Sequence, residues 1–415
     1  MNELVNNPLL QTSAINKVIN DVELDPAAYR GQEILPFSTT DEEKIVIDIK
    51  KLLGGMTQAV ASGAESPIVT PRGIMQKTFW PAHFREKQLL SPRDLNRIRK
   101  LGTTSDVDKA QEVIADVSKS LRERVETRIE WTRWQAIQGS LSYDENSVSV
   151  SVDYKFPSAN TPTLTGTDLW SATTTATPVN DIMDWIFLFR GTGVQFKKMW
   201  FNAQVEKYLF QNSSIATLVN QVLAGGNSSL MTRKVLTNLF DTYIGNVPFE
   251  VYDKGYYVAT EIGSAVTAVD TAITVNSING FASGDSVTLT TYDGQTSETA
   301  TIESVSGTTI ELLAGTTNAF TVGSEIRAWK PFIPNNVVIM EGELPPGARG
   351  GNKIGEFIST GTEYGTGSLT NLVPGIFGET QIHENDDPKY CAVIGGVSGL
   401  PILYRENGFI VATVA

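Results

Sequence analysis

The side chains that most often carry catalysis are sparse in this chain. It contains two histidines and one cysteine in 415 residues. His83 and His383 lie far apart in the sequence, so a histidine-based metal site or a Ser-His-Asp triad has few candidates. Cys391 lies beside an apolar run, which predicts a small buried side chain rather than a nucleophile. No two carboxylates stand out as an acid/base pair. We therefore predict no catalytic, cofactor or metal site, and a protein that is not an enzyme.

Two weaker patterns could hold a ligand. A glycine-rich stretch could suggest a phosphate-binding loop, although no Gly-Lys-Ser/Thr ending and no strand-to-helix context follow it: Gly347, Gly350, Gly351 and Gly355. An acidic loop with Glu384, Asp386 and Asp387 could bind a cation, but such loops are usually solvated. Neither pattern changes the prediction.

Composition limits the classes of protein further. The chain is 41% hydrophobic and 19% charged, which indicates an ordered protein large enough for two or three cores. A net charge of -13 argues against a surface that neutralises phosphates. The N-terminus is polar, and the most apolar run, 182–189, is far too short to span a bilayer. We expect a soluble chain made in a cytoplasm, without a membrane partner.

The longest regular pattern is an amphipathic helix over Ser105–Gly139. Its apolar side chains recur every three or four residues: Val107, Ala110, Ile114, Val117, Leu121, Val125 and Ile129. Charges are expected on the opposite face: Lys109, Lys119, Arg122, Glu123, Arg124, Glu126, Arg128 and Glu130. Ser105 is a candidate N-cap and Gly139 a natural C-terminal stop. Such a helix is roughly 50 Å long, which suggests an extended subunit with large partners.

A long hairpin is predicted before this helix, over residues 43–90. Two strand-like segments flank a glycine-bearing tip, and such a ribbon is marginal unless a partner covers it. Phe79, Trp80 and Phe84 lie on it without a clear local core pattern. They are candidate contacts between subunits; filling the core of their own domain is an equally good interpretation.

A short basic helix is predicted over residues 91–102. Arg93 and Arg97 could form a nucleic-acid patch, but in so acidic a chain we favour ion pairs with neighbouring carboxylates. They are therefore also candidate contacts between subunits.

The rest of the chain indicates an α+β protein. Residues 1–42 resemble an arm that crosses a surface, and 148–154 alternates as a strand. Further helical patterns, separated by short strands such as 247–252, are predicted over 178–188, 197–211, 215–223 and 232–243. Near the C-terminus, strands are predicted over 401–404 and 409–414.

Residues 259–328 differ in composition from the rest. They are rich in Thr, Ser, Val and Gly and read as short strands separated by turns. The segment also repeats itself, with a shared Phe-x-x-Gly-x-x-Val/Ile unit about 39 residues apart. The members of the first copy are Phe281, Gly284 and Val287, and those of the second are Phe320, Gly323 and Ile326. We predict a small all-β barrel or sandwich inserted at a hairpin tip, projecting from the parent domain.

The order of these elements resembles the major capsid proteins of tailed phages, and most of all the lambda-type major capsid protein E family, built on the Hong Kong 97 type fold. Five stretches carry the resemblance in family order: Ser66-Pro67-Ile68-Val69, Arg128-Ile129-Glu130-Trp131, Val251-Tyr252-Asp253, Ile333-Pro334-Asn335-Asn336, and Asp386-Asp387-Pro388 with Gly399-Leu400-Pro401. Residues 259–328 depart from the family pattern, because they replace a short hairpin end.

The resemblance implies a domain architecture. It comprises an N-terminal arm (1–42), an extended loop (43–90), a peripheral domain with a spine helix, an axial domain and the inserted domain. The peripheral domain would take 91–177 and 355–390, with the spine helix at 105–139. The axial domain would take 178–258, 329–354 and 391–415, and the insertion 259–328.

The resemblance also implies a function. The chain would be a non-catalytic subunit that self-assembles, as hexamers and pentamers, into the icosahedral head of a double-stranded DNA phage. It would enclose DNA without sequence-specific binding, assemble in the host cytoplasm and reside in the virion. Expected partners are a separate scaffolding protein, a portal and a decoration protein. Two alternatives stay open: an encapsulin-like nanocompartment shell, and a carbohydrate-active enzyme with a β accessory module.

Overall fold

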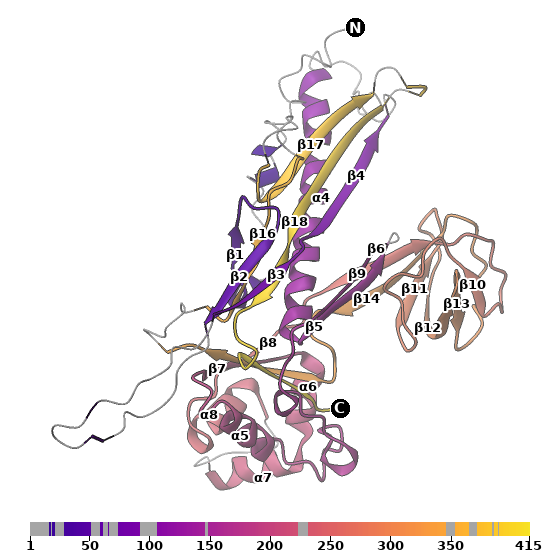
Figure 1. The fold of residues 1–415 in the computed structure, drawn as a ribbon. Coiled ribbons are helices and arrows are strands. Elements are labelled where there is room, and N and C mark those ends of the chain that lie inside the picture. Colours follow the sequence, from indigo (N-terminus) through magenta and orange to yellow (C-terminus); the bar gives the residue numbers. More distant parts are fainter. Residues whose placement is uncertain are drawn as a thin grey trace.

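A computed structural model shows an elongated molecule with a long helix at its centre (Figure 1). The structure describes residues 16–17, 19–20, 29–50, 59–60, 65, 74–91, 106–145, 148–222, 231–345, 353–364, 372–383, 386–388 and 390–415. No helix in these ranges is both long enough and apolar enough to cross a membrane.

The long helix α4 spans Asp106–Ile137. This agrees with the predicted helix to within two residues at each end; the proposed cap at Ser105 lies outside the described residues. Gly139 ends the helix with a φ of 96°, a conformation that glycine adopts without strain. The apolar stripe faces inward, because Val117, Leu121 and Val125 are all at least 93% buried. Glu130 contradicts its predicted place on the charged face, since it is fully buried.

A five-stranded sheet packs against this stripe. Its central strand β18 (Tyr390–Leu403) pairs with β4 (Ala82–Leu90) along one edge. Along the other edge it pairs with β17 (Ile376–His383) and then with β16 (Gly355–Ser359), beside which lies β1 (Phe37–Thr39). At Gly395 a Cβ would lie 3.1 Å from the Cβ of Leu121. Glycine in mid-strand therefore lets the helix lie close on the sheet.

Two predicted boundaries are wrong in this region. The hairpin predicted over 43–90 consists of β2 (Ile45–Lys50) and β3 (Ile74–Phe79), because β4 leaves it to pair with β18. The predicted axial domain includes residues 391–415, yet 391–403 belong to β18 at the centre of the sheet on α4. The pairing of β4 with β18 joins segments about 300 residues apart, so no local pattern specifies it.

A second body is built on the four-stranded sheet β19-β15-β7-β8. Its strands are β19 (Phe409–Thr413), β15 (Val337–Glu343), β7 (Gln195–Phe201) and β8 (Phe249–Val251). Four helices lie beside it in Figure 1: α5 (Pro178–Leu188), α6 (Ala203–Gln211), α7 (Ser213–Val222) and α8 (Arg233–Tyr243). The helix predicted over 197–211 is wrong in its first part, because residues 195–201 form the strand β7. The last three residues of β7 are all buried, so this strand shows no alternation of exposed and buried side chains. Asn202 then caps α6 through the backbone N–H groups of Gln204 and Val205.

The segment before α5 also belongs to this body rather than to the sheet on α4. Its short 3-10 helices are η3 (Ser158–Asn160) and η4 (Gly166–Asp168). Thr163 bridges to Thr413 of β19, and the backbone N–H of Trp170 donates to the carbonyl of Val414 at 2.7 Å. The boundary predicted at residue 177 therefore lies earlier, after the hairpin of β5 (Ser140–Glu145) and β6 (Val148–Asp153).

A separate lobe is carried on the ribbon formed by β9 (Gly255–Glu261) and β14 (Glu325–Pro331) (Figure 1). It also contains β10 (Ala272–Thr274), β11 (Ser286–Thr290), β12 (Ser297–Ser306) and β13 (Thr309–Leu312), in the order β10-β13-β12-β11-β14-β9. A bridge between Ile262 and Val275 joins the two ends of this order. The buried side chains of the lobe form a hydrophobic cluster of their own.

The sequence repeat has a structural counterpart in this lobe. Phe281 and Phe320 are both at least 92% buried, and Val287 and Ile326 are fully buried. Gly284 and Gly323 have φ values of 86° and 83°. The two copies also pair with each other, because β11 of the first copy is antiparallel to β14 of the second. In both copies the repeated Phe and Val/Ile residues are core side chains, and the repeated glycine adopts a turn conformation.

Val269 carries backbone strain at the surface of this lobe. Its φ is 75°, although the side chain is 81% exposed and gains little from burial. A β-branched residue is strained there by about 1 kcal/mol, whereas asparagine adopts this region readily. We expect Val269→Asn to stabilise the lobe by about 1 kcal/mol, measured by amide hydrogen exchange of its core strands. Val322→Asn is the control, since Val322 is 61% exposed without a positive φ. If the core amides were equally protected against hydrogen exchange in the two variants, the claim that Val269 is strained would be wrong.

Candidate assembly surfaces and the buried junction

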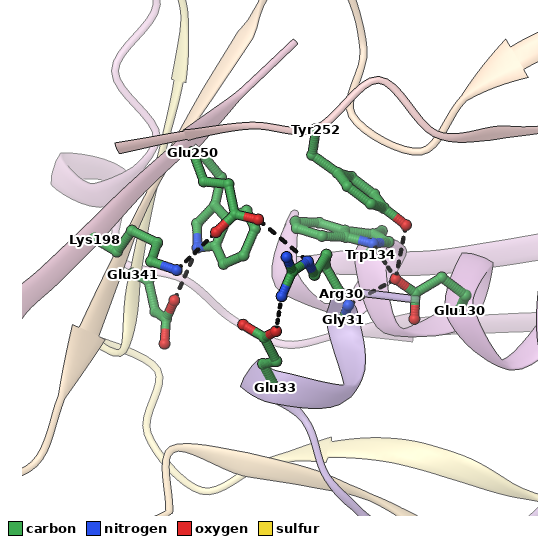
Figure 2. A network of polar contacts seen from close by, with 10 residues as sticks. Arg30, Gly31, Glu33, Glu130, Trp134, Lys198, Glu250, Tyr252 and Glu341 are labelled. Carbon is green, nitrogen blue, oxygen red and sulfur yellow. Dashed lines mark hydrogen bonds and ion pairs between the residues drawn. The ribbon is translucent and has the colours of Figure 1, made fainter. Parts of the chain in front are cut away.

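The last turns of α4 meet the N-terminal arm and the second body at one buried carboxylate. Oε1 of Glu130 accepts hydrogen bonds from three groups of different elements (Figure 2). The donors are the backbone N–H of Gly31 at 2.6 Å, Nε1 of Trp134 at 2.8 Å and the hydroxyl of Tyr252 at 3.1 Å. Gly31 begins the short helix α2 (Gly31–Ile34) of the arm. One oxygen atom therefore ties three separate segments together.

The other oxygen of Glu130 faces a buried cation. Nη1 of Arg133 lies 3.5 Å from Oε2, and both side chains are at least 99% buried. Burial raises the pKa of Glu130 and lowers that of Arg133, while each charge partly offsets the shift of the other. Oε2 of Glu130 and two nitrogens of Arg133 have no hydrogen-bond partner within the described part of the chain. The pair is therefore costly to break from either side.

A second set of charges surrounds this junction. Arg30 lies 3.2 Å from Glu250 of β8, which also pairs with Lys198 of β7 at 2.8 Å (Figure 2). Glu341 of β15 accepts from Nε1 of Trp200 at 2.8 Å. The rings of Trp134 and Trp200 meet edge to face, 5.7 Å between centroids. The junction thus fixes the arm to α4 and α4 to the second body.

The aromatic contact candidates have different surroundings. Trp80 is 64% exposed, and Nζ of Lys44 lies 4.2 Å from its ring centroid. Phe79 is half-buried against the main core. Phe84 is half-buried as well, and its ring lies 5.7 Å from Tyr143 and 4.8 Å from the guanidinium of Arg128. Phe84 therefore fills its own chain's core, whereas Trp80 is available to a partner.

Other candidates are placed as follows. Arg93 and Arg97 lie outside the described residues. Cys391 is buried, and burial raises the pKa of its thiol to about 11, as expected of a packing residue. Nδ1 of His383 lies 3.0 Å from Asp386 at the end of β17. No group of three or more His, Cys, Asp or Glu side chains in the described ranges could hold a metal ion.

The buried pair at the junction was missed from the sequence. Arg133 lies four residues after Ile129, so it continues the apolar stripe of α4. A charge on an apolar stripe is the available signal, because it requires a buried partner of opposite sign. Its partner Glu130 is three residues before it, a spacing that brings two side chains together on a helix.

The described residues thus build a helix-backed sheet, a second body joined to it at a buried junction, and a side lobe. The chain belongs to the phage major capsid protein E family, whose family model matches residues 12–292. It is a phage major capsid protein, a subunit of a shell built from repeated copies, and it resides in the virion. None of the curated proteins compared with the chain matches it in sequence.

Several solved structures resemble this chain to different degrees. A prophage protein of Escherichia coli CFT073, assigned as a capsid protein, aligns with a TM-score of 0.53 at 14% identity, over 98% of this chain and 99% of its own. A phage-related protein of Bordetella bronchiseptica RB50 aligns at 0.47 and 9% identity, over 97% and 96%. A structure from Mycobacterium phage Patience aligns at 0.40 and 10% identity, over 97% and 88%. The first of these likenesses supports the fold described above.

Proposed function

We propose that this capsid protein forms the icosahedral head of a tailed double-stranded DNA phage, as hexamers and pentamers of a Hong Kong 97 type subunit. The observation that carries the proposal is the amount of surface that one subunit leaves uncovered. The chain exposes 23027 Å². A compact monomer of 45.2 kDa exposes roughly 16,000 Å². The excess is larger than most obligate interfaces bury, roughly 2,000–5,000 Å².

The domain roles follow from where the surface lies. The hairpin β2–β3 is the extended loop that lies over a neighbour, and Trp80 marks its contact. The peripheral domain is α4 with the sheet β1-β16-β18-β17 and β4. The axial domain is the sheet β19-β15-β7-β8 with its four helices, and it meets its copies around the fivefold and sixfold axes. The lobe on β9 and β14 is an inserted domain that projects from the shell.

The chemistry of the chain fits a container for DNA. Its net charge of -13 does not favour tight binding of phosphates, so packaged DNA can be spooled in and released. We further propose assembly in the host cytoplasm with a separate scaffolding protein, a portal and a decoration protein. The role is structural, without catalysis or a cofactor.

Removing the lobe is expected to leave assembly intact. Its core shares no buried residue with the rest of the chain. Tyr257 and Trp329 are cross-strand partners, so a short glycine-containing turn can replace Ala259–Ala328 without altering β8 or β15. We expect particles of normal diameter by electron microscopy. A complete loss of particles would show that the lobe carries a contact essential for assembly.

The direct test of the proposed function is electron microscopy of the overexpressed protein, alone and with its scaffolding protein. Closed particles with icosahedral symmetry are expected. A protein that stays monomeric under every condition would contradict the proposal.

A further inference from the structure

The ribbon that carries the lobe presents one face entirely to solvent. We call this the ribbon face; it consists of Tyr257, Ala259 and Glu261 of β9 and Glu325, Arg327 and Trp329 of β14. The register places these residues in three rows. Trp329 is opposite Tyr257, Arg327 is opposite Ala259, and Glu325 is opposite Glu261. The face is thus aromatic at the end near the body, basic in the middle and acidic at the end near the lobe.

The charges of the ribbon face are not satisfied within the described chain. Glu261 and Glu325 are like charges directly opposite each other, an arrangement that destabilises a sheet. Glu261 accepts only a long hydrogen bond, 3.4 Å, from Asn276. Arg327 lies over the ring of Tyr257, 5.4 Å from its centroid, and forms no ion pair with a described residue. A partner that places a cation near the two glutamates and a carboxylate near Arg327 would therefore satisfy these charges.

The aromatic row points to a protein partner. Tyr257 is 65% exposed and Trp329 is 46% exposed. Trp, Tyr and Arg are the residues that most often dominate protein–protein interfaces, and here they are adjacent on a flat ribbon. In contrast, Tyr256 on the other face of β9 packs against Phe332, with ring centroids 5.6 Å apart. The exposed row is therefore not needed for the ribbon's own packing.

We propose that the ribbon faces of two neighbouring copies of this chain pack against each other, with their strands antiparallel. A twofold contact needs a surface that complements itself. Reversing the row order and offsetting the two copies by one row places Arg327 of one copy opposite Glu325 and Glu261 of the other, twice. The aromatic row of each copy then lies at an outer end of the contact. Keeping the same order would place four glutamates together. The charge pattern therefore selects a second copy, in the antiparallel arrangement.

This pairing rests on the proposed shell. A patch of six side chains per copy is smaller than the roughly 1,200 Å² that a stable isolated complex buries. In a shell, other contacts hold the copies in place, so a weak contact forms at high effective concentration. The pairing then strengthens an assembled shell rather than building it, which is consistent with particles that form without the lobe.

Crosslinking of assembled particles tests the pairing. Ala259→Cys introduces a thiol near the centre of the ribbon face. Cys391 is buried with its pKa raised to about 11, so its thiol reacts slowly. Facing sheets lie about 10 Å apart, so a bis-maleimide of similar reach is used. Thr299→Cys is the control, an exposed position on β12 outside the ribbon face. We expect covalent dimers with Ala259→Cys in particles and not with Thr299→Cys.

Charge reversal gives the second measurement. In the Ala259→Cys background, Arg327→Glu should lower the dimer fraction about tenfold, and adding Glu325→Arg should restore it. Particles are counted by electron microscopy before crosslinking, so the two proposals fail separately. Intact particles without Ala259→Cys dimers, equal dimers in the Thr299→Cys control, or no response to Arg327→Glu would overturn the pairing. An absence of particles would overturn the shell and the pairing that rests on it.

Discussion

Glu130→Gln is expected to destabilise the subunit by about 3 kcal/mol, because it leaves the buried guanidinium of Arg133 without its counter-charge. The amide oxygen can still accept from Gly31, Trp134 and Tyr252, which are the donors to Oε1. The amide nitrogen, however, would face a guanidinium that can only donate. The loss is measured as the shift of the urea unfolding midpoint of the unassembled subunit, followed by tryptophan fluorescence.

Substituting the other member of the pair, Arg133, is expected to change how the stability of the subunit depends on pH. Arg133→Met removes the cation that favours the ionised form of Glu130, whose pKa burial already raises. An acid with a folded pKa above its unfolded value loses stability as pH rises through and above the unfolded value, about 4.3 for glutamate. We therefore expect Arg133→Met to be less destabilised, relative to wild type, at pH 5 than at pH 8.

The double variant separates a coupled pair from two independent defects. Glu130→Gln with Arg133→Met contains no buried charge, and such neutral replacements are often tolerated. We expect the double variant to be more stable than Glu130→Gln alone, with a coupling energy of about 2 kcal/mol. Additive losses would show that the two charges do not depend on each other.

Trp80→Ala is expected to block assembly without unfolding the subunit. Its ring is 64% exposed beside Lys44, so its removal leaves no cavity in the chain's own core. A tryptophan at the centre of an interface contributes about 2 kcal/mol or more, which corresponds to a rise of roughly 30-fold in the concentration needed for assembly. Light scattering across a concentration series measures this, and urea unfolding checks that the fold is retained.

The matched control is Tyr292→Ala. Tyr292 is 86% exposed on the lobe and lies outside the ribbon face. We expect it to change the assembly concentration less than twofold. If Trp80→Ala assembles at the wild-type concentration, or if Tyr292→Ala blocks assembly as strongly, the hairpin contact assigned to Trp80 is wrong.

Local patterns specified the elements that bury one face. The helix α4 was predicted because its apolar stripe repeats over about six turns, and Pro178–Leu188 because its first turns carry proline and Asp181. The turn glycines Gly284 and Gly323 revealed the repeat of the lobe for the same reason, since each local conformation has its own residue preference.

Long-range pairing was not predictable in this way. The strand β18 contains three glycines and is buried on both faces, so it shows neither alternation nor a typical strand composition. Its register with β4 joins segments about 300 residues apart. Similarly, the residues of β7 were predicted as the start of a helix. Met199, Trp200 and Phe201 are consecutive apolar residues that are all buried, so the sequence shows no strand-like alternation there. A strand covered on both sides has no period of two.

The candidate functional residues also differ in whether the local sequence indicates them. Trp80 is proposed from the sequence as a contact between subunits, and its exposed ring is compatible with that proposal. The pair of Glu130 and Arg133 was missed, because the three segments that meet there come from residues 31, 130 and 252. Only the fold brings them together.

A cryo-electron microscopy reconstruction of the assembled protein tests the central claim most directly. We predict a closed icosahedral shell in which the β2–β3 hairpin of each subunit lies over its neighbour, with Trp80 in the contact. A 45.2 kDa monomer in every condition tested would contradict the account.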